Sequence, residues 1–275
     1  MYTADAKQPG LAQGGAALIL TGLAAGFASS FLGIGGGLVM VPALTLGAAM
    51  PFRRAVGTSL AAIVPVAACG VLVESFVQAS NIRWGCAVLL MAGSLAGAAA
   101  GARLESRSKP AMLRRLMAVV LVAAAVRLSG VTGGGVSAGV LPDPLAGAGI
   151  PATFAIGLCG GITSSLFGIG GGLITVPGMT FLFSGLPFHA ARATSLAVIV
   201  PTAIAAALLA HGKGLVDVAA AKSLVVPALF GSVAGVLAAN RLPEMPLRIT
   251  FCVYLLYAAV KLLLPPGAPR EEAPA

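Results

Sequence analysis

Two glycine clusters are the groups in this chain whose spacing most clearly suggests chemistry. The sequence Gly-Ile-Gly-Gly-Gly occurs at residues 33–37 and again at residues 168–172, each time inside an apolar run. Glycine loses more backbone entropy on folding than other residues, so each cluster should end one helix and precede another. The start of a helix exposes free backbone N–H groups and the positive end of the helix dipole, and both attract anions. We therefore expect two helix starts that face one small anion.

A Thr-Ser pair follows each glycine cluster and adds hydroxyl groups. These hydroxyls could donate to the same anion, or they could only cap the next helix. The glycines could likewise serve only close helix packing. With these alternatives open, the residues expected to bind substrate are Gly33, Gly35, Gly36, Gly37, Thr58, Ser59, Gly168, Gly170, Gly171, Gly172, Thr194 and Ser195.

The composition indicates a membrane protein built from helices. Of the 275 residues, 58% are hydrophobic and 9% are charged, whereas soluble domains have about 25% charged residues. Apolar runs of about 20 residues recur, and each is long enough to cross a hydrocarbon core of about 30 Å. The net charge is +9, and the basic residues lie between these runs, as is typical of cytoplasmic loops. They do not form one basic face that could bind nucleic acid.

The glycine clusters belong to a longer internal repeat. Pro51-Phe52 is matched by Pro187-Phe188, and Ile63-Val64-Pro65 is matched by Ile199-Val200-Pro201. Chance similarity of apolar segments would not preserve prolines and glycines at matching places. The expected organisation is a polar N-terminal segment (1–15), a first membrane repeat (16–131), a Gly/Pro-rich linker (132–151), a second membrane repeat (152–264) and a polar tail (265–275).

The length of the first broken run suggests how each repeat is built. Residues 16–49 would measure about 50 Å as one helix, which is too long for a single crossing. A re-entrant pair of helices that meets at the glycines fits better. The predicted fold is therefore an all-α polytopic membrane protein with two homologous repeats. Each repeat has one glycine-broken pair and three transmembrane helices, and this odd number predicts inverted repeats. The basic loop 103–115 should be cytoplasmic and the linker outside.

Few other side chains suggest chemistry. Glu74 is the one carboxylate within an apolar run, and we expect it at the membrane interface. His189 and His211 fall in predicted loops and should be solvated. No metal site, nucleophile–base pair or ATP-binding loop is apparent, so we expect neither a cofactor nor an enzyme. We interpret the four cysteines as small buried residues: Cys69, Cys86, Cys159 and Cys252. We interpret five glycines outside the clusters as close-packing residues between helices: Gly93, Gly97, Gly101, Gly231 and Gly235.

The duplicated motif resembles the signature of the TauE/SafE family, the sulfite-exporter-like permeases. The first copy runs from Gly26-Phe27 through the glycine cluster and Val41-Pro42 to Thr58-Ser59-Leu60, and the second runs from Gly161 to Leu196. The resemblance covers about residues 16–264. One departure is that Val56-Gly57 in the first copy corresponds to Arg192-Ala193 in the second. The resemblance implies an inner-membrane transporter of small sulfur-containing anions, such as sulfite, thiosulfate or organosulfonates, without fixing the direction.

Together these features predict a secondary transporter that alternates access to a site at the paired glycine breaks. An anion channel and a membrane-embedded thiol or sulfur-handling protein remain alternatives. The expected partners are a small anionic substrate and the lipid bilayer, but not nucleic acid. The sequence leaves open a coupling proton and a homodimer.

Overall fold

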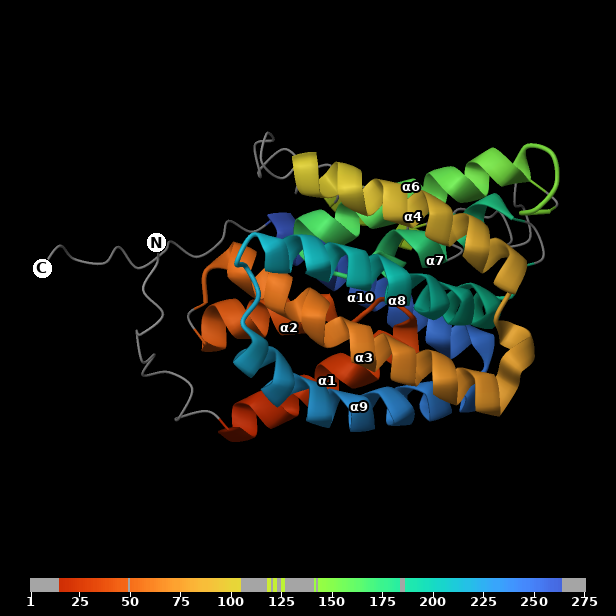
Figure 1. Cartoon of the computed structure of the whole chain (residues 1–275). Coiled ribbons are helices and arrows are strands. Elements are labelled where there is room, and N and C mark those ends of the chain that lie inside the picture. Colours follow the sequence, from red (N-terminus) through yellow and green to blue (C-terminus); the bar gives the residue numbers. More distant parts are fainter. Residues whose placement is uncertain are drawn as a thin grey trace, which may run out of the picture.

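The structure, a computed structural model, is a bundle of long helices that lie roughly side by side (Figure 1). It describes residues 15–48, 50–104, 118–119, 121–122, 125–126, 141, 143–183 and 186–263. Five described helices are long and apolar enough to cross a membrane, which confirms the all-helical membrane fold. The helices are α1 (Gly15–Leu32), α2 (Gly37–Pro42), α3 (Phe52–Gln78), α4 (Trp84–Leu104), α6 (Gly149–Phe167), α7 (Gly172–Leu182), α8 (Phe188–Gly212), α9 (Val218–Arg241) and α10 (Glu244–Leu263).

The described helices fall within the two predicted membrane repeats, apart from the first residues of α1 and α6. A π-helical turn, Ala43–Gly47, extends α2, and a 3₁₀ turn, Ala79–Asn81, follows α3. Helix α3 begins at Phe52, because Pro51 takes an extended conformation and is the last residue before the helix. Helix α6 begins at Gly149, inside the segment assigned to the linker. The last part of the first predicted repeat, residues 116–131, lies almost wholly outside the described residues, as do both chain ends.

Corresponding helices of the two halves of the chain run in opposite directions. Helices α1, α3 and α9 begin at one end of the bundle, called here the Arg54 end, and α4, α6 and α8 begin at the other, called the Arg83 end (Figure 1). Two contacts fix this arrangement. Lys213, which follows α8, donates to the carbonyl of Ala102 near the end of α4. Arg192, near the start of α8, contacts Glu74 near the end of α3. Corresponding helices of the two repeats, such as α3 and α8, are therefore antiparallel.

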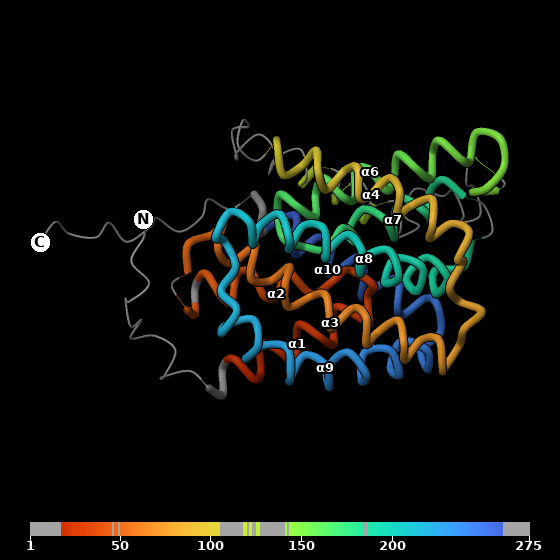
Figure 2. Tube along the Cα trace, in the orientation of Figure 1, coloured from red at the N-terminus to blue at the C-terminus, as the bar shows by residue number. Residues whose placement is uncertain are grey.

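Each glycine cluster turns the chain back on itself. Helix α1 runs inward from the Arg54 end and α2 returns toward it, whereas α6 and α7 do the same from the Arg83 end (Figure 2). The two helical hairpins are exchanged between the halves. Helix α1 packs on α9 of the second half, and α6 packs on α4 of the first half. Each hairpin is thus held mainly by the other repeat.

Small residues make these two helix crossings close. A methyl group added to Gly97 of α4 would lie 2.1 Å from the carbonyl oxygen of Leu158 in α6. One added to Gly231 of α9 would lie 2.2 Å from the carbonyl oxygen of Leu23 in α1. The close-packing interpretation of these glycines is therefore confirmed, as small residues at membrane helix interfaces would suggest.

Hydroxyl groups join the same crossings in an approximately symmetric way. Ser165 of α6 donates to the carbonyl of Ala98 in α4 at 2.9 Å. Its counterpart, Ser30 of α1, shares a 2.6 Å hydrogen bond with the Ser232 hydroxyl of α9. Hydrogen bonds between membrane helices contribute modestly, about 0.6 kcal/mol on average. They therefore set the register of the hairpins more than their stability.

We expect Gly97→Leu to prevent α4 and α6 from packing, because its side chain would meet the backbone of Leu158. Overpacking of this kind costs about 1–3 kcal/mol or more. Size-exclusion chromatography in detergent should show loss of the folded monodisperse species. Gly212→Leu is the control, since no heavy atom lies within 4 Å of a methyl group added there. Unchanged folding of the Gly97 variant would contradict the close-packing role.

Candidate anion site at the glycine loops

The two glycine loops have nearly the same backbone conformation. In the first loop, Gly33, Gly35 and Gly36 have φ angles of 71°, 90° and 68°, and the corresponding glycines of the second loop have φ angles of 68°, 86° and 79°. Residues with a Cβ avoid this left-handed region, at a cost of about 1–2 kcal/mol each. The clusters therefore need glycine for their backbone path. Both predicted helix starts are confirmed, because α2 begins at Gly37 and α7 at Gly172.

The loops meet backbone to backbone inside the bundle. A methyl group added to Gly37 would lie 1.8 Å from the carbonyl oxygen of Gly168, and one added to Gly172 would lie 2.2 Å from that of Gly33. Every residue from 31 to 38 and from 167 to 173 is buried. Each helix start is therefore faced by a carbonyl of the other loop, whose partial negative charge complements the positive end of the helix dipole.

Both loops keep backbone donors that remain unused. Among the hydrogen bonds of the described residues, none uses the N–H groups of residues 35–38 or 170–173 as donors. The N–H groups that follow do have acceptors, because Met40 donates to the carbonyl of Gly36 and Thr175 to that of Gly171. A cluster of unpaired N–H groups at each helix start is the arrangement that binds small anions.

Two serine hydroxyls add to these unused donors. Ser29 near the end of α1 and Ser164 near the end of α6 are fully buried, and neither Oγ has a hydrogen-bond partner. They occupy equivalent positions in the two repeats. Ser29 lies beside its loop, because a methyl group added to Gly36 would approach its Cβ to 3.2 Å. Buried hydroxyls are rarely left without a partner, and a ligand that binds beside them is one explanation. The sequence prediction missed both residues, although their symmetry was visible.

The predicted serines of the Thr-Ser pairs do contact the loops. Ser195 donates to the carbonyl of Gly33 at 2.9 Å, and Ser59 lies 3.2 Å from the carbonyl oxygen of Gly168. Each serine thus reaches from one repeat to the glycine loop of the other. The hydrogen of Ser195 positions the first loop, whereas the hydrogen of Ser59 is shared with the carbonyl of Val56 in its own helix, at 2.9 Å. The serines are not helix caps, because Pro51 and Pro187 precede α3 and α8.

The predicted threonines lie elsewhere. Thr194 accepts a hydrogen bond from the backbone N–H of Arg83, just before α4, and Thr58 accepts one from that of Asp217, just before α9. Consecutive residues of an α-helix point about 100° apart around its axis, so the two hydroxyls of each Thr-Ser pair face different elements. The structure therefore brings together the glycines and serines of the prediction, while the threonines hold the starts of α4 and α9.

A buried ion pair stands beside the first loop. Arg192 donates to Glu74 at 2.6 Å, and both side chains are fully buried. Glu74, which was expected at the membrane interface, is buried in protein, because Arg192, Asn81 and Asn240 enclose its carboxylate. Sequence reasoning also missed Arg192 as a site residue. The available signal was its mismatch with Val56 between the two copies.

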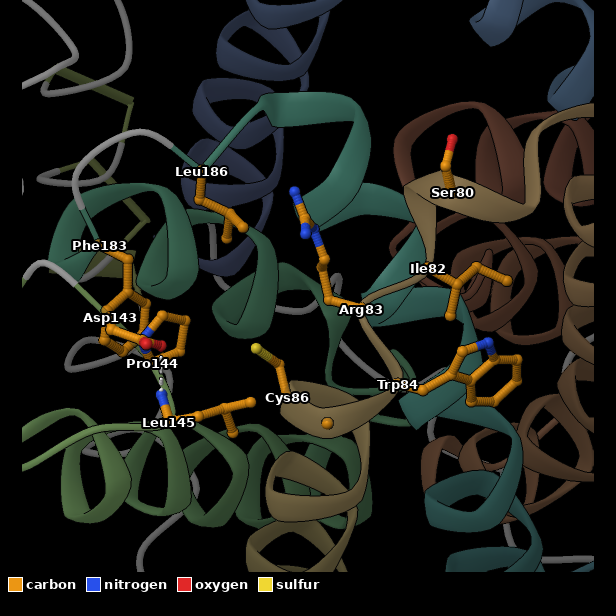
Figure 3. Close-up of a pocket in the computed structure, with 11 residues that line it drawn as sticks. Ser80, Ile82, Arg83, Trp84, Cys86, Asp143, Pro144, Leu145, Phe183 and Leu186 are labelled. Carbon is orange, nitrogen blue, oxygen red and sulfur yellow. Dashed lines mark hydrogen bonds between the residues drawn. The ribbon is translucent and has the colours of Figure 1, made fainter.

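A separate cavity of about 410 Å³ opens at the Arg83 end. Figure 3 shows Arg83 and Cys86 reaching it from the start of α4, and Asp143 and Leu145 from the segment before α6. No residue of either glycine loop lines this cavity. It is therefore distinct from the candidate anion site.

The remaining candidates do not form a chemical site. All four cysteines are free thiols: Cys86 and Cys252 are buried, Cys69 is half-buried and Cys159 is exposed. The interpretation as small buried residues is thus wrong for Cys159. His189 lies in the first turn of α8 and is partly buried rather than solvated, while His211 is exposed. Within the described residues, no three His, Cys, Asp or Glu side chains could hold a metal ion.

We expect Ser195→Ala to destabilise the fold by about 1 kcal/mol, because the buried carbonyl of Gly33 would lose its donor. A thermal melt in detergent should show the loss. Ser223→Ala is the matched control, since this exposed serine bonds only within its own helix, to the carbonyl of Ala219. Equal melting of the two variants would show that Ser195 does not position the loop.

Comparisons with known proteins agree with this architecture. The family model of the sulfite exporter TauE/SafE matches residues 3–128 and 153–275, one segment for each repeat. The chain is 25% identical over 265 residues to the "Probable membrane transporter protein YunE" of Bacillus subtilis strain 168, covering 90% of this chain and 96% of that protein. It is 32% identical over 111 residues to a "Probable membrane transporter protein" of Xylella fastidiosa strain Temecula1, covering 39% of this chain and 40% of that relative.

The relatives agree on the class of protein. The chain matches only about two fifths of the length of the Xylella relative, but almost the whole length of the Bacillus protein. No solved structure matches the chain. Because the family model covers most of both repeats, the chain belongs to the sulfite exporter TauE/SafE family, whose members are membrane transporters rather than enzymes.

Proposed function

We propose that this protein is a secondary transporter of small sulfur-containing anions, such as sulfite, thiosulfate or an organosulfonate. The observation that carries the proposal is the pair of glycine loops, whose unused N–H groups lie where the two repeats meet backbone to backbone. Sulfur oxyanions present several acceptor oxygens to such donors. The backbone provides these donors without a charged side chain, which suits a site inside a lipid-immersed bundle. The name of the family supports the sulfur chemistry.

Alternating access is the proposed mechanism. Both loops are buried and press directly on each other, so an anion can reach the N–H groups only when the loops part. Because each hairpin packs mainly on the other repeat, rocking of the repeats against each other would draw the two loops apart and change the end from which the site is reached. A channel would instead need a continuous path past the loops. This contact therefore favours a transporter over a channel.

We further propose that the repeats are inverted across the inner membrane, with the Arg54 end in the cytoplasm. Exposed or partly exposed basic residues are more numerous at that end, where Arg53, Arg54, Arg103, Lys213 and Lys222 lie. The segment 105–115, which follows α4, adds four basic residues in sequence. An excess of Lys and Arg marks cytoplasmic loops. The two glycine-broken hairpins would then be re-entrant from opposite sides.

Uptake by proteoliposomes that contain only this protein tests the function. We expect saturable uptake of labelled sulfite, thiosulfate or a small sulfonate, competed by the same unlabelled anion. Sulfate and chloride should compete poorly. Flux that rises in proportion to concentration without saturating would instead identify a channel. Absence of flux for all sulfur anions in correctly inserted protein would refute the proposed substrate class.

We expect Ser29→Ala and Ser164→Ala to weaken substrate binding without harming the fold. A hydrogen bond to a charged ligand contributes roughly 1.5–3 kcal/mol, so KM should rise about ten- to hundredfold. The melting temperature of the free protein should stay the same or rise, since neither Oγ has a partner to lose. Ser223→Ala should change neither quantity. A KM unaffected by both substitutions would place the anion away from these hydroxyls.

A further inference from the structure

The arginine beside the first glycine loop breaks the symmetry of the two repeats. Arg192 occupies the position that Val56 has in the first repeat. The two residues are placed alike, because a methyl group added to Gly33 would lie 3.1 Å from the Cα of Arg192, and one added to Gly168 would lie 3.1 Å from that of Val56. One loop is therefore packed against a hydrocarbon side chain and the other against a cation.

The guanidinium of Arg192 is incompletely paired. Its Nη2 donates to the carboxylate of Glu74 at 2.6 Å, and its Nη1 donates to the carbonyl of Ser30 at 2.7 Å. Its Nε is buried and has no acceptor. Arginine offers five donors in a planar fork that matches the oxygens of a carboxylate or an oxyanion. The cation thus has spare hydrogen-bonding capacity next to the loop.

The carboxylate of Glu74 is held by more than the arginine. Asn81 donates to its Oε1 at 2.9 Å, and Asn240 donates to its Oε2 at 2.9 Å. These two amides belong to the 3₁₀ turn after α3 and to α9. They would keep donating to Glu74 if Arg192 moved away. The Glu74 carboxylate would therefore still have two hydrogen-bond donors if its ion pair with Arg192 were broken.

The Arg192–Glu74 pair lies where two charges contribute little to the stability of the fold. Leu72 and Phe76 flank Glu74 on α3 and are 60% and 89% exposed, so the outer surface at this depth is apolar and suited to lipid. A buried ion pair gives little net stability, because desolvation offsets the attraction between the charges. Ionisable side chains inside membrane proteins usually mark a substrate or ion pathway.

We infer that Arg192 is the specificity-determining cation of this transporter and that Glu74 is the resident anion that the substrate displaces from it. The inference rests on the proposed function and adds a named binding residue to it. When the loops part, the substrate oxyanion takes the place of the Glu74 carboxylate on the guanidinium, and Asn81 and Asn240 retain the carboxylate. Only one repeat supplies the cation, so the site is asymmetric and fits a single anion.

Charge-neutralising variants test the exchange, in proteoliposomes and in thermal melts with sulfite. Glu74→Gln leaves Arg192 without its competitor, so KM for sulfite should fall at least about tenfold, since a buried charge without a partner is costly until an anion binds. Sulfite should then raise the melting temperature more than it does in the wild type. Arg192→Gln should abolish saturable uptake. Arg54→Gln, at an ion pair with Asp217 near the opposite end, is the control and should behave as wild type.

The double variant Glu74→Gln/Arg192→Gln separates binding from folding. It removes both charges, so it should fold even if one single variant does not, and we expect it to lose the response to sulfite in both assays. A double variant with wild-type KM would show that the pair is only structural and would overturn the inference. If the wild type transports no sulfur anion, the proposed function fails separately. Stabilisation of Glu74→Gln, but not of the double variant, by chloride would then still support Arg192 as the anion-binding cation.

Discussion

The structure depends on the need to satisfy backbone polar groups where two helices break inside a lipid-immersed bundle. Lipid offers no hydrogen bonds, so a broken helix is tolerated only if protein or a bound ligand replaces the missing partners. Here the two breaks face each other. The carbonyls of Gly33 and Gly168 accept from Ser195 and Ser59, while the N–H groups of the helix starts stay unused. The unused donors of both loops have the same sign, which makes an anion their natural complement.

This constraint also explains the packing of the repeats. Each loop needs partners from the other half, so the hairpins are exchanged: α1 lies on α9, and α6 lies on α4. Glycines at both crossings allow the backbones to approach closely enough for the loops to meet. Two nearly equivalent halves can then move against each other, and this motion would part the two loops. The Arg192–Glu74 pair breaks this equivalence, because it places charged side chains beside only one of the two loops.

Much of this architecture could be predicted from the sequence, because composition and the internal repeat leave few alternatives. The helix starts at Gly37 and Gly172 followed from glycine chemistry alone. The partners of Thr58, Thr194 and Glu74 could not be predicted, because helix rotation and contacts between distant helices decide where those side chains point. Thr194 meets Arg83, and Glu74 meets Arg192, over long sequence separations. Similarly, the unpaired hydroxyl groups of Ser29 and Ser164 could be identified only from the full set of contacts.

The most direct test of the central claim is to locate a bound anion. Selenite has the shape and charge of sulfite, and its selenium scatters X-rays anomalously, so crystals grown with selenite should reveal its position. The account predicts one anomalous peak between the two glycine loops, within hydrogen-bonding distance of N–H groups from residues 35–38 or 170–173. A peak confined to the cavity lined by Arg83 and Asp143, with the loops unchanged, would contradict it.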